Sequence, residues 1–307
     1  MSGYNLIVVL GPTATGKTLL GAKLAYKFNG EIISADSRQV YKYMDLGTGK
    51  DLSDYIVNGV KIPYYMIDIL EPDKEFDLYG FNNLFSEFYA NIKANNKIPF
   101  LVGGSFLYID SIINNYELVK ADFNGKEFEK LNKYNEEELK KILLSVSSGL
   151  HNSTDLTDKG RMIKAIIVEN AKKSGNILAK PKIKPLILGI TLPNDIIKNR
   201  ISERLKNRLR CGMIEEVGNL VSMGITLEKL IYFGLEYKYI GLHIAGKLSY
   251  NDMFQKLNSA IYEFARKQIK WFRKMERNGV NIHKIIGPNY EKAVEIINKN
   301  YFLNNEI

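Results

Sequence analysis

The stretch GPTATGKT, residues 11–18, decides the fold of this chain. It follows the apolar run YNLIVVL (4–10) and leads into TLLGAKLAYKFN (18–29), whose apolar residues recur at helical spacing. A strand, a glycine-framed loop and a helix in this order, with G-x-x-x-x-G-K-[S/T] in the loop, are typical of a phosphate-binding loop. Backbone N–H groups and the helix N-terminus bind phosphate oxygens, a lysine adds charge, and the final hydroxyl can reach Mg²⁺. We therefore expect a diphosphate or triphosphate at Gly11, Pro12, Thr13, Ala14, Thr15, Gly16, Lys17 and Thr18, with Thr18 as the metal contact.

Alternating apolar runs and amphipathic segments predict an α/β fold with a doubly wound parallel sheet, as in P-loop NTPases. The expected strands are 4–10, EIISA (31–35), YYMIDIL (64–70), KIPFLV (97–102) and PLILGITL (185–192), with a helix over 81–96. Ligands of such sheets bind at the carboxyl ends of the strands. The segments to inspect are therefore 11–18, 36–41 and 103–108.

The chain also shows a change of composition that predicts a second domain. Residues 112–155 are polar and rich in Lys and Glu, which indicates a small helical insertion, and the core is predicted to comprise 1–111 and 156–307. A helix over 160–173 is placed in the core, before the strand at 185–192. Residues 194–278 are expected to form a helical, basic C-terminal part, and 292–307 a surface helix.

The net charge of +9 is concentrated in one segment. Residues 181–277 carry 18 Lys and Arg against 9 Asp and Glu, whereas the rest of the chain carries 25 of each kind. Such a segment favours a polyanionic partner, although solvated basic helices would give the same count. The single cysteine, Cys211, excludes an intramolecular disulfide, and no apolar run approaches the roughly 20 residues of a membrane span. A cytoplasmic protein that does not contact a membrane is expected.

Two acidic residues are candidates for the chemistry of the site. Asp36 follows the strand at 31–35 and could act as a base or hold a metal-bound water, but it could equally cap a helix. Asp68 could be a metal ligand or a residue within a strand. Ser105, in the turn Gly103-Gly104-Ser105, would face the same crevice or cap the following helix.

Two basic helices are predicted in the C-terminal part. Ile197, Ile201, Leu205 and Leu209 form an apolar stripe, and Arg200, Arg204 and Arg208 repeat one position earlier, so they line one edge of that stripe. Along one edge they could address a single anion. In EFARKQIKWFRKMER, Arg266, Lys270 and Arg273 share one face, which suits RNA binding. Trp271 and Phe272 could support that contact or belong to the core.

Taken together, several of these stretches resemble the tRNA dimethylallyltransferases, or tRNA isopentenyltransferases, of the bacterial type. The matching stretches lie within residues 6–275 and are GPTATGKT, SADSRQVYKYMDLGTGK, PFLVGGSFLYI, GRMIKAIIVENAKKSG, RISERLKNRLRCGMIEEV and FARKQIKWFR. The combination of SADSRQVY with RKQIKWFR is more specific than the phosphate loop alone.

The resemblance implies transfer of a dimethylallyl group from dimethylallyl diphosphate to N6 of the adenosine just 3′ of the anticodon, in tRNAs that read codons beginning with U. It implies that the loop at 11–18 binds the prenyl diphosphate with Mg²⁺, that Asp36 is the base, and that Ser105 and Arg204 act at the reacting groups. The implied tRNA contacts are Asp36, Ser37, Arg38, Gln39, Ser105, Arg161, Met162, Ile163, Lys164 and Ala165, joined by the basic face of Arg266, Lys270 and Arg273. The insertion at 112–155 would bind the anticodon stem-loop, and a monomer is expected.

The chain departs from the family pattern at a few positions. GTGKD replaces GTAKP, GGS replaces GGT, Lys164 stands where Arg is common, and FGLEYKY (233–239) is an altered form of a stretch expected to meet tRNA. Two other functions compete with the first. An adenylate dimethylallyltransferase acting on AMP, ADP or ATP would need no basic face, and a P-loop small-molecule kinase or RNA-binding NTPase would transfer no prenyl group.

Overall fold

The computed structural model describes residues 3–123, 125–146, 158–173, 175 and 177–302, and the chain divides into two compact units. The first unit comprises residues 1–115 and 181–307, and the second comprises 116–180. Among the described helices, none is long and apolar enough to cross a bilayer. The two units are described separately.

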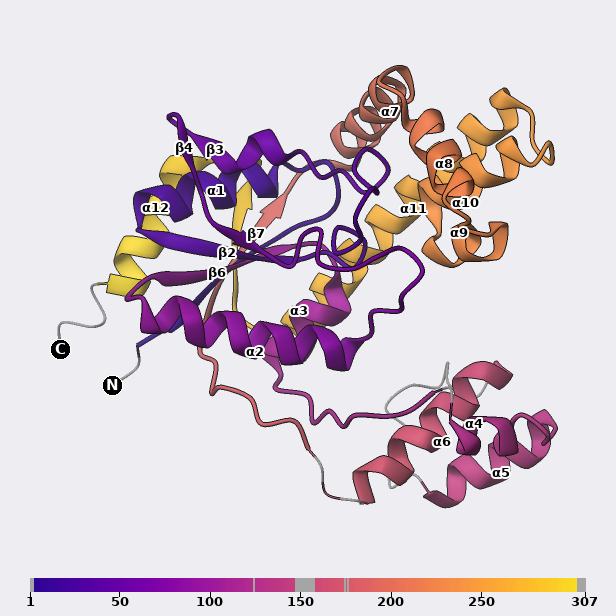
Figure 1. Cartoon of the computed structure of the whole chain (residues 1–307). Helices are drawn as coiled ribbons and strands as arrows, with labels where there is room; N and C mark the ends of the chain where they lie inside the picture. The colour runs from indigo at the N-terminus through magenta and orange to yellow at the C-terminus, as the bar shows by residue number, and fades with distance from the viewer. Residues whose placement is uncertain (1–2, 124, 147–157, 174, 176, 303–307) are drawn as a thin grey trace. The chain divides into compact units, whose positions relative to one another are not determined.

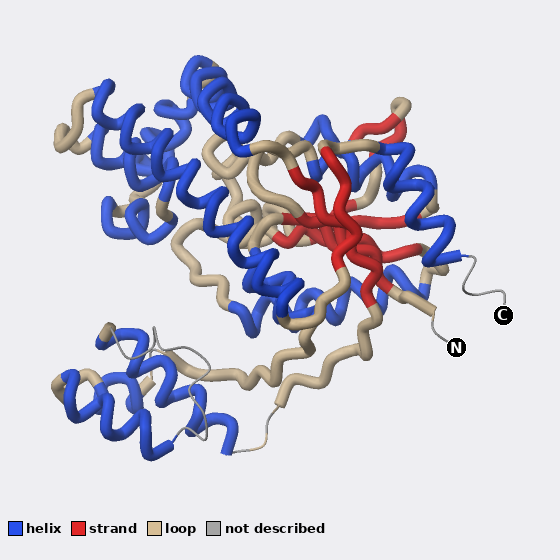
Figure 2. The backbone as a smooth tube through the Cα atoms, turned by 180° about the vertical axis from the view of Figure 1, so that it is seen from behind, coloured by secondary structure: helices blue, strands red, loops and turns tan. Residues whose placement is uncertain are grey.

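A six-stranded parallel sheet forms the centre of the first unit (Figures 1 and 2). Its strand order is β5-β2-β6-β1-β7-β8, with bounds β1 Leu6–Leu10, β2 Gly30–Ala35, β5 Tyr64–Tyr65, β6 Ile98–Gly103, β7 Pro185–Thr191 and β8 Ile282–Ile286. The carboxyl ends of β1, β2 and β6 are neighbours, because β6 lies between the other two. The predicted doubly wound α/β fold is confirmed.

Alternate residues of β1 enter two separate cores, which explains its unbroken apolar run. Ile7 and Val9 pack toward α1 (Lys17–Lys27) and α12 (Tyr290–Ile297), and all are within one buried cluster. Leu6, Val8 and Leu10 pack instead with α2 (Leu78–Ala94), α3 (Phe106–Ile113) and the end of α11 (Tyr250–Arg277). Figure 1 shows α1 and α12 on one side of the sheet and α2 and α3 on the other.

A group of helices follows β7 and builds its own core. These helices are α7 (Asn194–Arg210), α8 (Met213–Ser222), α9 (Leu227–Phe233), α10 (Leu235–Ile244) and the first half of α11. The predicted stripe of Ile197, Ile201, Leu205 and Leu209 is buried in that core. The second half of α11 joins the sheet core through Phe272 and Met275, so one helix connects the two cores.

The second unit is helical, and it is longer than predicted. Its helices are α4 (Lys126–Leu131), α5 (Glu136–Val146) and α6 (Lys159–Lys173). The boundary predicted at 112–155 is wrong at both ends: residues 112–115 belong to the first unit, and the second runs to residue 180. The sequence predicts α6 as part of the first unit. In the structure its apolar face packs on Leu139 and Leu143 of α5, so α6 belongs to the hydrophobic core of the second unit. Residues 147–157 lie outside the described part of the chain.

Local differences from the predicted elements have physical causes. The strand expected at 64–70 is limited to Tyr64–Tyr65, because Met66 and Asp68 take positive φ angles of 66° and 55° that no strand accommodates. The strand β8 was not predicted. The C-terminal helix α12 ends at Ile297 and is followed by η3 (Asn298–Phe302), a short π-helical turn. A hairpin of β3 (Ile56–Val57) and β4 (Val60–Lys61) follows the short helix η1 (Leu52–Tyr55).

Candidate active site

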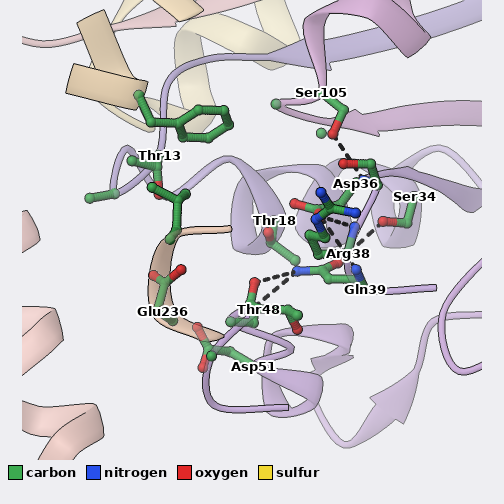
Figure 3. A pocket seen from close by; sticks show the side chains of 18 of the residues that line it. Thr13, Thr18, Ser34, Asp36, Arg38, Gln39, Thr48, Asp51, Ser105 and Glu236 are labelled. Atoms are coloured by element: carbon green, nitrogen blue, oxygen red, sulfur yellow. Dashed lines mark hydrogen bonds between the residues drawn. The ribbon is translucent and has the colours of Figure 1, made fainter. Parts of the chain in front are cut away.

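A pocket opens at the carboxyl ends of β1, β2 and β6, where the sequence predicted it (Figure 3). The loop after β1 contributes Thr13, Gly16, Lys17 and Thr18, and the loops after β2 and β6 contribute Asp36 and Ser105, among others. Helices α7, α10 and α11 close the pocket with Arg204, Arg208, Glu236, Phe264 and Gln268. The segments 11–18, 36–41 and 103–108 therefore meet in one place.

The loop after β1 has the shape of a phosphate-binding loop. Ala14 and Gly16 have φ angles of 64° and 81°, and the Thr15 hydroxyl donates to the Pro12 carbonyl oxygen at 2.8 Å. α1 begins at Lys17, and Gly16 at its N-cap has no side chain to satisfy the first amides of the helix. Those amides and the positive end of the helix dipole suit an anion.

Gln268 of α11 fixes this loop against the loop after β6. Its Oε1 accepts from the Thr13 amide at 2.9 Å, and its Nε2 donates to the Gly104 carbonyl oxygen at 2.7 Å. A Cβ at Gly104 would lie only 2.5 Å from the Gln268 Nε2 atom, so the close approach requires glycine there. Gln268 lies in the quoted motif RKQIKWFR, but sequence reasoning assigned it no role.

The three arginines on α7 have different environments. Arg204 donates from Nη2 to the Thr13 hydroxyl at 2.5 Å, and Arg208 pairs with Asp51 at 3.1 Å. Arg200 is exposed, and its nearest polar contact is a long one, 3.5 Å from Nη1 to the Ala14 carbonyl oxygen. Burial, followed by the charge of Arg208, lowers the pKa of Arg204 to about 10, so it stays a cation at neutral pH.

Lys17 lies deep in the pocket. Burial lowers the pKa of its ammonium group to about 8; Asp36 raises this pKa, while Arg204 and Arg208 lower it further. A bound anion favours the protonated form. The loop is thus electropositive before it binds a ligand, and that positive charge weakens at alkaline pH.

Relative to the Lys17→Arg variant, we expect the affinity for inorganic pyrophosphate to be constant below about pH 8 and to fall by up to about tenfold per pH unit above it. The reason is that the free protein loses the Lys17 proton near this pH, whereas the complex retains it, so binding must take up a proton. Isothermal titration calorimetry at a series of pH values measures this directly. Lys17→Arg is the matched control, because arginine stays protonated and pyrophosphate's own titration is common to both proteins. Equal pH profiles for the two proteins would contradict the prediction.

Asp36 combines the two roles that the sequence left open. Its Oδ1 accepts from the backbone amides of Arg38 and Gln39 at 2.9 and 3.3 Å, which caps the turn after β2, although no helix follows. Asp36 also lines the pocket, as Lys17 does, and Figure 3 shows the Asp36 side chain there. The turn therefore orients this carboxylate toward the phosphate-binding loop.

The neighbouring polar residues hold the loops in register. The Ser105 hydroxyl accepts from the Ser37 amide at 2.9 Å, and it makes no capping bond to α3, although Ser105 occupies the N-cap position. The buried Gln39 accepts from Ser34 and donates from Nε2 to the Gly49 carbonyl oxygen at 3.0 Å. These bonds join the loop after β2 to the loop after β6 and to residues 48–49.

Comparison with known proteins identifies the family. The family model described as IPP transferase matches residues 39–275. The chain belongs to the IPP transferase family. It is 44% identical to tRNA dimethylallyltransferase 1 of Geotalea uraniireducens, over 96% of this chain and 98% of the relative. It is 46% identical to tRNA dimethylallyltransferase 2 of Phocaeicola vulgatus, over 97% of this chain and 98% of the relative. The crystal structure of tRNA delta(2)-isopentenylpyrophosphate transferase from Staphylococcus epidermidis is similar, with 30% identity, a TM-score of 0.66, and coverage of 96% of this chain and 98% of the other.

Two carboxylates complete the surroundings of this IPP transferase pocket, and sequence reasoning missed both. Glu236 lines the pocket, and burial raises its pKa, opposed by Arg204 and Arg208 and reinforced by Asp36. Protonation of Glu236 would reduce the negative charge near a bound anion.

The second carboxylate, Glu216 of α8, supports a pocket loop. It accepts from the amides of Asp45, Leu46 and Gly47 at 2.6–3.0 Å and from the Tyr237 hydroxyl at 2.7 Å. It thereby fixes the loop that carries Gly47, Thr48 and Gly49 to the pocket.

Neither of the two roles predicted for Asp68, metal ligand or strand residue, fits the structure. Asp68 lies outside the strand β5 and pairs with the buried Lys50, which also bonds Asp45 at 2.9 Å and the Tyr41 carbonyl oxygen at 2.5 Å. Among the described residues, no group of three or more His, Cys, Asp or Glu could hold a metal ion. Thr18 and Asp36 are pocket residues with oxygen donors, and Mg²⁺ commonly uses one or two protein oxygens together with substrate phosphates and water.

The remaining predicted RNA contacts belong to two different units of the chain. Met162 and Ile163 are each 1% exposed in the core of the second unit, which contradicts direct side-chain contact with RNA, whereas Arg161 and Lys164 are exposed. Ala165 is half-buried beside that core.

The basic residues predicted on α11, namely Arg266, Lys270 and Arg273, are exposed. They lie on the side of the helix away from Gln268 and the pocket, and Arg266 pairs with Glu263 at 2.8 Å. Phe272 is buried, and Trp271 stacks on Phe106 at 4.7 Å between ring centroids, so both belong to the packed side of the helix.

Proposed function

We propose that this chain transfers a dimethylallyl group from dimethylallyl diphosphate to N6 of the adenosine 3′-adjacent to the anticodon of tRNA. The observation that carries the proposal is that Asp36 and the phosphate-binding loop with Lys17 line one pocket. The relatives' names, tRNA dimethylallyltransferase, support the same reaction. The distribution of charge over residues 181–277 favours a tRNA acceptor over free AMP.

The proposed reaction breaks the allylic carbon–oxygen bond and forms a carbon–nitrogen bond. The diphosphate departs with the electron pair of the broken bond, N6 of adenine attacks the allylic carbon, and the displaced N6 proton passes to the Asp36 carboxylate. Because adenine's amino group is a weak nucleophile, most of the acceleration must come from stabilising the departing anion. The phosphate-binding loop therefore serves a leaving group, and no phosphoryl group is transferred.

The anion-stabilising groups are the first amides of α1, Lys17 and Arg204. Arg204 reaches the loop from α7 through its 2.5 Å bond to Thr13, and its cation persists at neutral pH. The Thr18 hydroxyl would help to hold Mg²⁺, and the ion would supply positive charge that neutralises part of the diphosphate. Lys17, Thr18 and Arg204 all line the same pocket.

The acceptor adenosine must leave its base stack to reach Asp36, since the carboxylate lies inside the pocket. Extruding a base requires that the surrounding RNA be held. We assign that task to the second unit, with Arg161 and Lys164 exposed on α6, and to basic residues of the C-terminal helices.

The test is a transfer assay with labelled dimethylallyl diphosphate, Mg²⁺ and either unmodified tRNA or AMP, followed by digestion and detection of N6-dimethylallyladenosine. Product on tRNA and none on AMP is expected. Product on AMP alone would identify an adenylate dimethylallyltransferase. ATP hydrolysis or phosphoryl transfer without any prenyl transfer would identify a kinase or an NTPase, and either outcome overturns the proposal.

We expect the triple variant Arg266→Gln, Lys270→Gln, Arg273→Gln to weaken tRNA binding. The slope of log K against log salt concentration should become shallower by up to about one for each lysine or arginine removed. The physical reason is that fewer counterions are released when fewer phosphates are neutralised. Filter binding or fluorescence anisotropy at several salt concentrations measures the slope. Lys23→Gln, Lys27→Gln, Lys93→Gln is the matched control, since these exposed lysines lie on α1 and α2, outside the basic segment. An unchanged slope for the first triple variant would show that this face of α11 is solvated and does not contact RNA.

A further inference from the structure

Tyr232, at the end of α9, is an exposed aromatic residue with two cations beside its ring. The side chain is 46% exposed. The Arg38 guanidinium carbon lies 5.3 Å from the centre of its ring, and the Lys229 ammonium nitrogen lies 5.2 Å from the same centre. Both distances are within the range of a cation–π contact.

Both cations are fixed by bonds of their own. Arg38 donates from Nη2 to the Tyr232 carbonyl oxygen at 3.1 Å, and Lys229 donates to the carbonyl oxygens of Asp73 and Lys74 at 3.1 and 3.0 Å. The arrangement therefore joins α9 to the loop after β2 and to residues 73–74. Because these protein side chains are already ordered, little of their conformational entropy is lost when a ligand binds there.

The next residue, Phe233, anchors this cluster in the core. Phe233 is 3% exposed and packs edge-on against Tyr41 and Tyr237, with ring centroids 5.0 and 5.9 Å apart. Phe233 and Arg38 both line the pocket that contains Asp36. Tyr232 does not line the pocket itself, but its ring contacts both of these lining residues and so lies directly beside the pocket wall.

An exposed ring flanked by cations has the chemistry of a nucleic-acid base platform. Aromatic side chains stack with bases, and neighbouring Lys and Arg attract the phosphates that connect them. A free nucleotide has one base, which would occupy the pocket itself. A polynucleotide that inserts one base must also lay an adjacent base across the mouth, and enzymes that extrude a base read their context through such flanking nucleotides.

We propose that the exposed part of the Tyr232 ring, beside Arg38 and Lys229, stacks on the base adjoining the target adenosine and so contributes to the choice of RNA substrate. This inference rests on the proposed function. It gives the stretch just before FGLEYKY a role in recognising the acceptor, separate from the diphosphate chemistry in the pocket. It also explains why an aromatic side chain remains exposed beside the pocket while its neighbour is buried.

The experiment compares Tyr232→Ala and Tyr232→Phe with the wild-type enzyme on anticodon stem-loop RNAs that carry a single abasic site on either side of the target adenosine. On intact RNA, Tyr232→Ala should weaken binding by about 5- to 150-fold, the range expected for loss of one stacked base, and Tyr232→Phe should bind as the wild type does. On the RNA that lacks the contacted base, wild type and Tyr232→Ala should bind equally. The KM for RNA should rise far more than kcat falls, and pyrophosphate affinity should not change.

Tyr26→Ala is the matched control, because Tyr26 is 42% exposed on α1 and does not line the pocket. It should behave as the wild type. Equal binding by Tyr232→Ala and wild type on intact RNA, or the same loss on both abasic RNAs, would overturn the stacking role. If the wild-type enzyme itself fails to prenylate tRNA, the proposed function fails instead, so the two failures are distinguishable. Pyrophosphate affinity and thermal melting also separate a loss of stacking from misfolding.

Discussion

Asp36→Asn should lower kcat for prenyl transfer by about 10²- to 10⁴-fold, the range typical of a lost general base, and should leave tRNA affinity nearly unchanged. Asparagine keeps an oxygen that can accept from the amides of Arg38 and Gln39, so the turn after β2 should persist. What it loses is the ability to take up the N6 proton. Single-turnover kinetics on a saturating anticodon stem-loop RNA would measure the chemical step, and anisotropy would measure binding.

Asp51→Asn provides the control for this substitution. Asp51 lines the same pocket, but it is largely exposed and pairs with Arg208 at 3.1 Å. We expect less than about a tenfold change, because the Asp51 carboxylate is largely exposed and asparagine keeps an oxygen that can accept from Arg208. Wild-type turnover for Asp36→Asn would remove Asp36 from the role of base, and equal losses for the two variants would indicate a general charge effect.

Arg204→Gln should lower kcat by about 10²- to 10³-fold, comparable to the loss of one donor to a developing anion. The half-buried Arg204 side chain contacts the Thr13 hydroxyl at the phosphate-binding loop, so we expect its charge to act where the diphosphate departs. Glutamine retains a hydrogen-bond donor but carries no charge. The effect should appear in kcat and in pyrophosphate affinity, whereas tRNA affinity should change little.

Arg200→Gln is the matched control for Arg204→Gln. It removes the same charge from the same helix one turn earlier. Arg200, however, is exposed, and its contact with the Ala14 carbonyl oxygen is long, at 3.5 Å. We expect less than about a threefold change in kcat, since a solvated charge is screened. Similar losses for the two variants would show that α7 acts through its overall charge. Thermal melting of both proteins excludes unfolding as the cause.

Much of the sheet could be predicted because its information is local. The run LIVVL, the loop GPTATGKT and the helix after it follow one another directly, and each pattern has one common structural solution. β8 was missed because IHKII is short and half polar, as suits an edge strand. The strand at 64–70 was overestimated because backbone angles at Met66 and Asp68, rather than hydrophobicity, end it.

The boundary of the second unit depended on contacts that no local pattern reveals. α6 reads as an ordinary amphipathic helix, and its apolar face would suit either unit. Only the packing of Met162, Ile163 and Ile166 on α5 places it in the second unit. The same contacts remove Met162 and Ile163 from the surface, although both lie in a stretch that resembles an RNA-binding motif.

By itself, the sequence determined that this chain has a parallel α/β sheet, a phosphate-binding loop at 11–18 and a carboxylate, Asp36, at the end of the next strand. These features depend on neighbours in the chain, so their patterns can be read directly. The resemblance singles out Arg204 among three equally spaced arginines, but its contact with Thr13 comes from the tertiary structure, which alone shows that Gln268 and Glu236 line the pocket and that Tyr232 lies beside it. Those residues lie some 190–260 positions from the loop in sequence, as the Arg204–Thr13 and Gln268–Thr13 bonds show with separations of 191 and 255 residues. Local spacing can place side chains on one face of a helix, but only packing against the sheet determines what that face meets.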